Sequence, residues 1–402
     1  MAIEELKNKE EFKKYIQDIK ANLKGYRDPI AFGIARVDRG QKNSEKILQA
    51  TFPVVNWKEN FGSAAVFAGA LRQSGIDMDF DGSEFICNAS KDFIENAYAL
   101  CSPYIEEATG DAHRNVQVIK HLHELYMGQG VYGDDYKVVF LFEDDSPKSV
   151  ESVYLKLYAL SLGKVPLRGI NLNGAFGVLP NVAWSGNMPI ELDWLRENEI
   201  SLKLDGMYPN IDSVDKFPRY LQHVIPADNT RILESSKVRM GAQLAAGTTV
   251  MPGASYINFN AGTTGAVMVE GRISSSAIVE EGSDVGGGAS ILGVLSGTNG
   301  NPITIGKNTL LGANSVTGIP LGDGCIVDAG IAILEGTKIT ISQKELSRIK
   351  EANPDANLEN KEVFKGLELA GLNGIHYRQE STTGTIKGFR SQREVKLNKD
   401  LH

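Results

Sequence analysis

Two charged residues stand close together in a stretch that otherwise holds mainly small and aliphatic side chains. Glu270 and Arg272 lie in the segment AVMVEGRI. Side chains two positions apart on a strand point the same way, so the carboxylate and the guanidinium would share a face. Together they offer a proton acceptor and a clamp for an anionic group. A surface ion pair of little energetic value is the plainer interpretation, and the two residues alone favour neither.

Three consecutive glycines, Gly286 to Gly288, follow in the segment SDVGGGASILG. Glycine weakens the interior of a strand unless something must approach the backbone closely. A tight corner would need only one glycine. The triplet therefore favours an extended ligand lying against the backbone.

A six-residue repeat positions these residues. Neither an amphipathic helix nor a half-buried strand has a period of six, whereas a hexapeptide β-helix turns one aliphatic side chain inward on each side of a triangular coil. The repeat predicts coils over 235–340, interrupted by insertions after Val250 and after Ile291, and insertions in repeat proteins often build the binding site. The aliphatic residues of the repeat are Val238, Leu244, Val250, Val267, Ile273, Val279, Val285, Ile291, Ile305, Leu311, Leu321, Val327, Ile333 and Ile339.

The 402-residue chain is long enough for two or three domains. We expect an α/β region of one or two subdomains over 1–234, then the β-helix over 235–340 and a C-terminal capping segment over 341–402. Apolar periodicity predicts a capping helix at 342–352. It also predicts helices at 7–23, 64–73, 92–100, 113–126 and 150–162, and strands at 30–37, 46–55 and 138–142.

Composition narrows the class of protein. The net charge of −8 argues against a nucleic-acid partner. Cys87, Cys101 and Cys325 are far apart, which suits neither a disulfide framework nor a metal cluster and points to a reducing compartment. No apolar run approaches the ~18 residues of a membrane helix. The charged N-terminus has no apolar leader, so we expect a cytoplasmic location.

Two further patterns carry little chemistry. The segment GQGVYG, residues 128–133, fits GxGxxG, but a helix precedes it and a strand follows, the reverse of the dinucleotide fingerprint, so a plain turn is expected. None of the six histidines lies within 235–340, and the repeat cannot by itself supply a histidine base or a histidine zinc site. His121 and His123 are two apart and would not share a helical face.

Long contiguous segments resemble the tetrahydrodipicolinate N-succinyltransferases, in the branch with a long N-terminal region. The segments are NFNAGTTGAVMVEGRISSSAIVEEGSDVGGGASILGVLSG, ITIGKNTLLGANSVTGIPLGDGCIVDAG, SVDKFPR and NGAFGVLPNVAW. The resemblance runs from about residue 137 to the end, and the first 130 residues show no recognisable motif. It implies a left-handed parallel β-helix in a homotrimer, with active sites between subunits. The implied reaction moves the succinyl group of succinyl-CoA, a co-substrate, to the amino nitrogen of ring-opened tetrahydrodipicolinate, in lysine and diaminopimelate biosynthesis.

The resemblance also assigns residues. It makes Glu270 the catalytic carboxylate, acting as a general base or as a nucleophile through an acyl anhydride. Arg272 becomes the substrate arginine. Some relatives hold magnesium on the trimer axis, but Ser236 stands where an Asp is expected, so no metal is expected here. Acyl-CoA contacts fall on Gly287, Ser290, Ala313, Asp328, Ala329, Gly336, Lys365, Arg378, Gln379, Glu380 and Ser381.

Two other functions stay open. Another CoA-dependent N-acyltransferase with an acetyl donor could use the same scaffold. A non-catalytic β-solenoid is the third hypothesis. An ice-binding solenoid would need regular rows of Thr on a flat face, which this sequence lacks.

Overall fold

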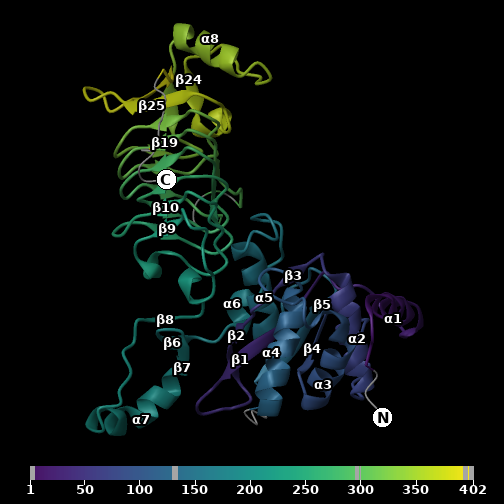
Figure 1. Ribbon diagram of the computed structural model, residues 1–402. Helices are drawn as coiled ribbons and strands as arrows, with labels where there is room; N and C mark the ends of the chain where they lie inside the picture. Colours follow the sequence, from purple (N-terminus) through teal and green to yellow (C-terminus); the bar gives the residue numbers. More distant parts are fainter. Residues whose placement is uncertain (1–4, 129–134, 295–297, 299, 393–396, 398–402) are drawn as a thin grey trace. The chain divides into compact units, whose positions relative to one another are not determined.

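The structure is a computed structural model that describes residues 5–128, 135–294, 298, 300–392 and 397. Residue contacts divide the chain into two compact units (Figure 1). The first comprises 1–159 and 170–216, and the second comprises 160–169 and 217–402. The second unit therefore starts before the expected boundary at 234, because Tyr220 and Val224 already pack in its core, and it includes the segment after 340.

An antiparallel sheet forms the centre of the first unit. Its order is β2 (Ile47–Thr51), β1 (Ala31–Arg39), β5 (Tyr136–Leu141) and β4 (Glu84–Asn88), and β3 (Asn56–Trp57) also pairs with β1. The strands expected from periodicity are confirmed to within a few residues at most of their ends.

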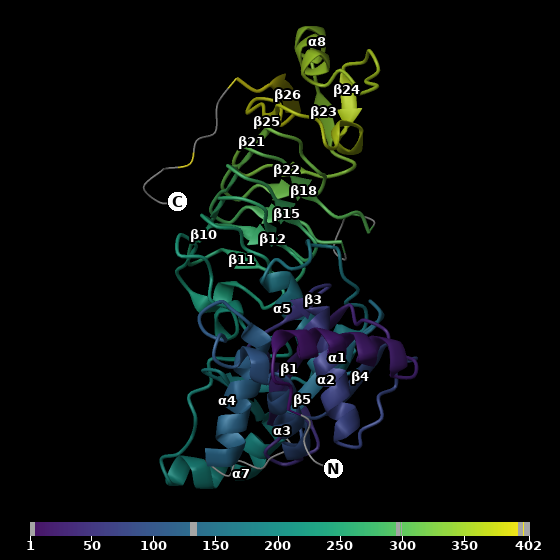
Figure 2. The same cartoon turned by 45° about the vertical axis from the view of Figure 1, so that its right-hand side comes forward.

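Helices pack against this sheet (Figure 2). The helices are α1 (Lys9–Asn22), α2 (Phe61–Gln73), α3 (Lys91–Leu100), α4 (Arg114–Gly128) and α5 (Val150–Ser161), with a short η1 (Ser102–Tyr104) and α6 (Ala175–Val178). Aromatic rings from sheet and helices interlock: the centroids of Phe32 and Phe67 lie 5.9 Å apart, as do those of Phe67 and Phe93. The predicted helices are confirmed. None of the helices that the structure describes has the length and apolar composition of a membrane span.

A smaller sheet completes the first unit. It consists of β6 (Val182–Ser185), β7 (Met188–Glu191) and β8 (Ser213–Asp215). Helix α7 (Leu192–Leu204) begins directly after β7. Trp184 is 1% exposed and packs with Leu48 of β2.

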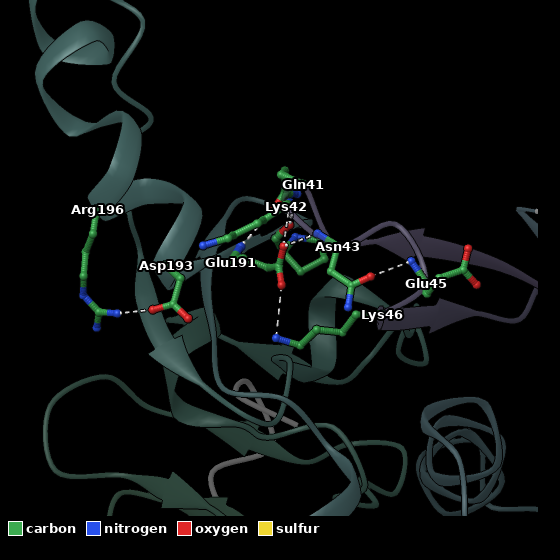
Figure 3. Close-up of polar contacts among 9 residues, drawn as sticks. Gln41, Lys42, Asn43, Glu45, Lys46, Glu191, Asp193 and Arg196 are labelled. Atoms are coloured by element: carbon green, nitrogen blue, oxygen red, sulfur yellow. Dashed lines mark hydrogen bonds and ion pairs between the residues drawn. The ribbon is translucent and has the colours of Figure 1, made fainter.

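A buried carboxylate fixes the loop between β1 and β2 (Figure 3). Glu191, whose side chain is 8% exposed, accepts hydrogen bonds at Oε2 from the backbone amides of Lys42 (2.8 Å) and Asn43 (3.3 Å). Its Oε1 lies 3.1 Å from Lys46 Nζ, and its own amide donates to Gln41 Oε1. Burial raises the pKa of Glu191, but the two amides and the Lys46 ammonium outweigh it and lower the pKa below its usual range.

The second unit is a stack of coils whose short strands form three parallel ladders. The first ladder contains β9 (Arg231–Ile232), β10 (Thr249–Val250), β13 (Met268–Val269), β16 (Asp284–Val285), β19 (Leu310–Leu311) and β21 (Ile326–Val327). The second contains β11 (Tyr256–Ile257), β14 (Arg272–Ile273), β17 (Ser290–Ile291), β20 (Val316–Thr317) and β22 (Ala332–Ile333). The third contains β12 (Gly262–Thr263), β15 (Ile278–Val279) and β18 (Thr304–Ile305). Short η2 (Tyr220–Gln222) and η3 (Ser235–Lys237) precede the regular coils.

The six-residue period is confirmed as the inward row of the coils. Every aliphatic residue of the repeat except Leu244 is 3% exposed or less, and Leu244 packs against the same core. The predicted insertion after Val250 is wrong, because β11 and β12 lie there as regular coil, with Ile257 and Thr263 turned inward. The insertion after Ile291 falls partly outside the described residues.

Residues 342–392 close the end of the stack. Helix α8 (Gln343–Ala352) starts at Ser342, whose hydroxyl accepts from the Glu345 amide, and buries Leu346 and Ile349 in the common core. The capping helix is thus confirmed. The remaining elements are β23 (Lys338–Thr340), β24 (Val363–Lys365), η4 (Gly366–Leu369), β25 (Ile375–Gln379) and β26 (Ile386–Arg390). β25 extends the first ladder by pairing in parallel with β21.

Replacing Glu191 by Gln should loosen the β1–β2 loop. The depressed pKa means that the ionised carboxylate stabilises the fold above its unfolded pKa of ~4.3, and that this contribution is lost as pH falls through the lower folded pKa. We expect faster amide hydrogen exchange at Lys42 and Asn43 in the variant at pH 7, with the difference from wild type shrinking as the pH falls through the lowered pKa of Glu191. Glu199→Gln, an exposed carboxylate on α7 that pairs with Lys203 of the same helix, is the control; equal exchange in both variants would contradict the role of Glu191.

Candidate functional site

The chain turns most tightly at Glu270. Only Glu270 and Gly271 join β13 of the first ladder to β14 of the second. One coil further on, the four residues from Gly286 to Ala289 make the same connection. The Glu270 amide donates to the Val285 carbonyl (2.8 Å), and the Glu270 carbonyl accepts from the Gly288 amide (3.2 Å). The half-buried Glu270 therefore occupies a shortened corner between two ladders.

The ladder register aligns one residue from each coil at this corner. Val269, Val285, Leu311, Val327 and Tyr377 lie side by side in the inward row. The residue that follows each of them points outward, and its backbone amide donates to the carbonyl of the inward residue in the next coil. The N–O distances are 2.8 Å (Glu270 to Val285), 2.8 Å (Gly286 to Leu311), 2.7 Å (Gly312 to Val327) and 3.0 Å (Asp328 to Tyr377). We call this outward set the corner row. Its members are Glu270, Gly286, Gly312, Asp328 and Arg378.

Each of the three positions from Gly286 to Gly288 has a different structural environment. A Cβ on Gly286 would lie 2.6 Å from the Leu311 carbonyl oxygen, so this glycine lets two coils stack. Gly288 has φ +72, in the left-handed region. A Cβ on Gly287 would meet only Glu270 Oε2, at 3.6 Å. Open space beside a backbone, the feature that the triplet predicts, therefore exists at Gly287 and directly adjoins the Glu270 carboxylate.

The structure places Arg272 and Ser290 at the start of the next ladder. They are register partners in β14 and β17, with Arg272 exposed and Ser290 6% exposed. In the part of the chain that the structure describes, no ion pair joins Glu270 to Arg272. The simple surface pair, which was the plainer interpretation, is therefore not formed.

Other predicted contacts divide between two corners. Ala313 and Ala329 follow Gly312 and Asp328, so they lie beside the corner row. Gly336 lies instead between β22 and β23, and Lys365 of β24 is the strand-register partner of Lys338 of β23. Within one chain these two residues belong to the corner after the second ladder.

The β25–β26 hairpin carries the last group of predicted contacts. Gln379 ends β25, and its side-chain amide donates to the Gly384 carbonyl (3.0 Å). Glu380 pairs with Lys387 (2.9 Å), and this hydrogen bond lowers the pKa of Glu380. Ser381 is exposed in the turn. β25 and β26 form an antiparallel hairpin, and the last group of predicted contacts lies at its turn end.

Asp328 is bonded to a histidine and an arginine of β25. Its Oδ1 lies 2.7 Å from His376 Nε2, and its Oδ2 accepts from Arg378 Nε at 2.7 Å. Burial raises the pKa of Asp328, but His376 and Arg378 outweigh it and lower the pKa below its usual range. His376 was missed from sequence. The alternation of β25 is the available signal, because it puts residues 376 and 378 on one face around buried Tyr377.

The metal expectation at Ser236 and the GQGVYG segment are the remaining points from the sequence. Ser236 Oγ donates to Glu234 Oε1 (2.5 Å), and this bond lowers the pKa of Glu234. Among the described residues, no group of three His, Cys, Asp or Glu is arranged to hold a metal ion, and the absence of a metal stays an expectation. Of GQGVYG, residues 129–133 lie outside the described residues.

Comparison with known proteins identifies the family to which the chain belongs. Family profiles match the N-terminal part of tetrahydrodipicolinate N-succinyltransferase over 10–177, its middle part over 179–219, and the hexapeptide repeat of succinyl-transferase over 302–335. A Sulfurovum sp. protein named 2,3,4,5-tetrahydropyridine-2,6-dicarboxylate N-succinyltransferase is 70% identical over 402 residues, 100% of both chains. The chain belongs to the tetrahydrodipicolinate N-succinyltransferase family. It is an enzyme, and its class is the acyltransferases.

Relatives in this family match along the whole chain. A Campylobacter jejuni protein of the same name is 59% identical over 397 residues, 99% of this chain and 100% of its own length. A crystal structure from Campylobacter jejuni, described as a candidate 2,3,4,5-tetrahydropyridine-2-carboxylate N-succinyltransferase, matches with a TM-score of 0.91 and 58% identity. It covers 97% of this chain and 99% of that chain. The family match thus begins near residue 10, well before residue 137, where the resemblance was first seen.

Neighbouring glycines should respond differently to the same change. Gly286→Ala should lower stability by about 1–3 kcal/mol, because its Cβ collides with the Leu311 carbonyl in the coil above. Gly287→Ala should leave stability nearly unchanged, since its Cβ makes only an ordinary contact. Thermal unfolding of both variants measures this. Equal destabilisation would show that the space at Gly287 is not open.

Proposed function

We propose that this enzyme transfers the succinyl group of succinyl-CoA to the amino nitrogen of ring-opened tetrahydrodipicolinate, in lysine and diaminopimelate biosynthesis. The observation that carries the proposal is the 70% identity over the full length of a protein named for this transfer. The geometry at Glu270 supports it, because a carboxylate adjoins open space at Gly287 in a corner between ladders. This open space lets both substrates reach the Glu270 carboxylate, which acts as the proton acceptor.

In the proposed reaction the protein positions the two substrates, accepts a proton and stabilises the developing negative charge. The amine nitrogen attacks the thioester carbonyl, the C–N bond forms, and the C–S bond breaks as the coenzyme A thiolate leaves. Ionised Glu270 accepts the proton that the nitrogen loses, and the thiolate takes up a proton. Attack by Glu270 itself, through an acyl anhydride, is the other route open to a carboxylate at this place. Backbone amides of the glycine-rich corner can stabilise the oxyanion without side-chain obstruction.

Arg272 suits the acidic ends of the substrates. The succinyl group and the amine acceptor both carry carboxylates, and a guanidinium grips a carboxylate with two parallel hydrogen bonds. Arg272 is exposed and lies two residues after Glu270. We assign it to substrate orientation.

The corner row suits a donor lying along the coils. From Glu270 to Arg378 there are four rungs, which span ~19 Å at the ~4.8 Å spacing of paired strands. The residues between are Gly286, Gly312 and Asp328, so the two glycines nearest Glu270 place no side chain in the path of the donor. The extended arm of coenzyme A between thioester and pyrophosphate is of this order of length. In this placement the thioester adjoins Glu270 and the phosphates approach Arg378.

The assembly proposed for this chemistry is a homotrimer of left-handed β-helices. Gly336 and Lys365 lie at a different corner from Glu270 within one chain, so both groups would touch one donor only if the corners of neighbouring subunits face each other. Succinyl-CoA enters as a co-substrate, and no step proposed here uses a metal. Because succinyl-CoA is an intracellular metabolite, we propose a cytoplasmic location.

Donor choice separates the two acyltransferase hypotheses. Purified enzyme with the amine acceptor should consume the thioester of succinyl-CoA at least about tenfold more efficiently than that of acetyl-CoA, measured as kcat/KM by thiol release. A preference for acetyl-CoA would replace the succinyl assignment. Absence of acceptor-dependent thiol release with either donor would favour a non-catalytic solenoid.

Glu270→Gln tests the role of the carboxylate. Removing the proton acceptor should lower kcat/KM by at least ~100-fold, whichever of the two routes operates. Glu280→Gln is the matched control, since Glu280 directly follows β15 as Glu270 directly follows β13, but at the corner after the third ladder. Full activity in the Glu270 variant would rule out both roles.

A further inference from the structure

The corner row ends in a cluster that joins the corner after β21 to strand β25 of the hairpin. His376 and Arg378 flank Tyr377, which is 0% exposed, so both point outward from β25. Asp328 lies between them, because the amide of Asp328 donates to the Tyr377 carbonyl (3.0 Å). The hairpin thus brings a histidine and an arginine to one carboxylate from 48 and 50 residues away.

Both oxygens of Asp328 are occupied. His376 Nε2 is 2.7 Å from Oδ1 and Arg378 Nε is 2.7 Å from Oδ2. Because an ionised carboxylate can only accept, His376 donates through Nε2. A carboxylate held at both oxygens cannot swing, so the bond from Arg378 Nε has a fixed direction.

Exposure orders the three side chains from inside to outside. The side chain of His376 is 18% exposed, that of Asp328 32% and that of Arg378 56%. Histidine is therefore the inner anchor and arginine the outer end. With Nε engaged, the terminal N–H groups of the guanidinium remain for an anion, and a guanidinium matches the geometry of phosphate.

Neighbouring charges leave this role to Arg378. Lys387 is its register partner across the hairpin, but Lys387 pairs with Glu380 at 2.9 Å. Phe389, the register partner of His376, offers only a ring whose centroid is 6.4 Å from the imidazole. The cluster is thus a short relay from histidine through carboxylate to guanidinium.

We infer that His376 is a positioning residue for donor recognition: through Asp328 it orients Arg378 toward the phosphate groups of the acyl donor. This inference rests on the proposed function, because it places the phosphate end of succinyl-CoA at the end of the corner row. It makes the cluster a determinant of specificity for phosphorylated donors over the bare pantetheine thioester. His376 itself touches neither the thioester nor the amine.

The test compares two donors in three variants. His376→Phe keeps a ring beside Phe389 and removes the donor to Asp328, whereas His376→Gln keeps an N–H donor. Thr382→Ala, an exposed position in the hairpin turn, is the control. For succinyl-CoA, His376→Phe should raise KM about five- to tenfold with kcat little changed, and His376→Gln should recover most of the loss. With succinyl-pantetheine, which lacks the phosphates, all variants should match wild type.

Asp328→Asn gives a second route to the same result, since it removes the carboxylate through which His376 acts, and should show the same donor-selective rise in KM. Thermal unfolding establishes that each variant is folded. An unchanged KM for succinyl-CoA in His376→Phe, or an equal loss with both donors, would overturn the inference. Neither outcome touches the proposed function, which fails separately if wild type turns over no succinyl donor.

Discussion

In-register stacking of inward aliphatic side chains is the constraint on which the second unit depends. A single coil buries almost nothing by itself, so each one gains its core only from the coils above and below. Val269, Val285, Leu311 and Val327 must therefore lie in line. Once they do, the residue after each one is fixed on the outside of the same corner. The chemistry of the corner row follows from the packing of the core.

The same constraint explains why the proposed site lies at an irregular corner. Inward rows have to stay aligned, so a change in the length of a coil is taken up at its corners. Between β13 and β14 the corner shrinks to Glu270 and Gly271, whereas the next coil uses four residues with three glycines. The shortened turn sets the carboxylate against the open side of Gly287.

The period of six was enough to predict the inward rows and the coil stack, because those features are local in sequence. It failed after Val250, where Thr263 takes the inward place and its hydroxyl bonds to Thr248 at 2.7 Å, so the aliphatic pattern lapses although the chain continues as coil. Contacts between distant segments could not be predicted. Glu191 fixes a loop nearly 150 residues earlier, and β25 joins β21 only after the chain has passed through α8. Motif resemblance supplied Asp328 and Arg378 but not His376, which is defined by the hairpin pairing.

Two acidic residues of the corner row show how environment divides their roles. Asp328 has one oxygen bonded to His376 and the other to Arg378, and its lowered pKa makes it a poor acceptor of protons. Within the described residues, no side chain or amide is bonded to the Glu270 carboxylate, which adjoins open space at Gly287. A carboxylate with both oxygens engaged can orient a guanidinium, and one with its oxygens unengaged can take a proton. The arrangement of partners thus favours Glu270 as the reactive carboxylate and Asp328 as an anchor, independently of any resemblance.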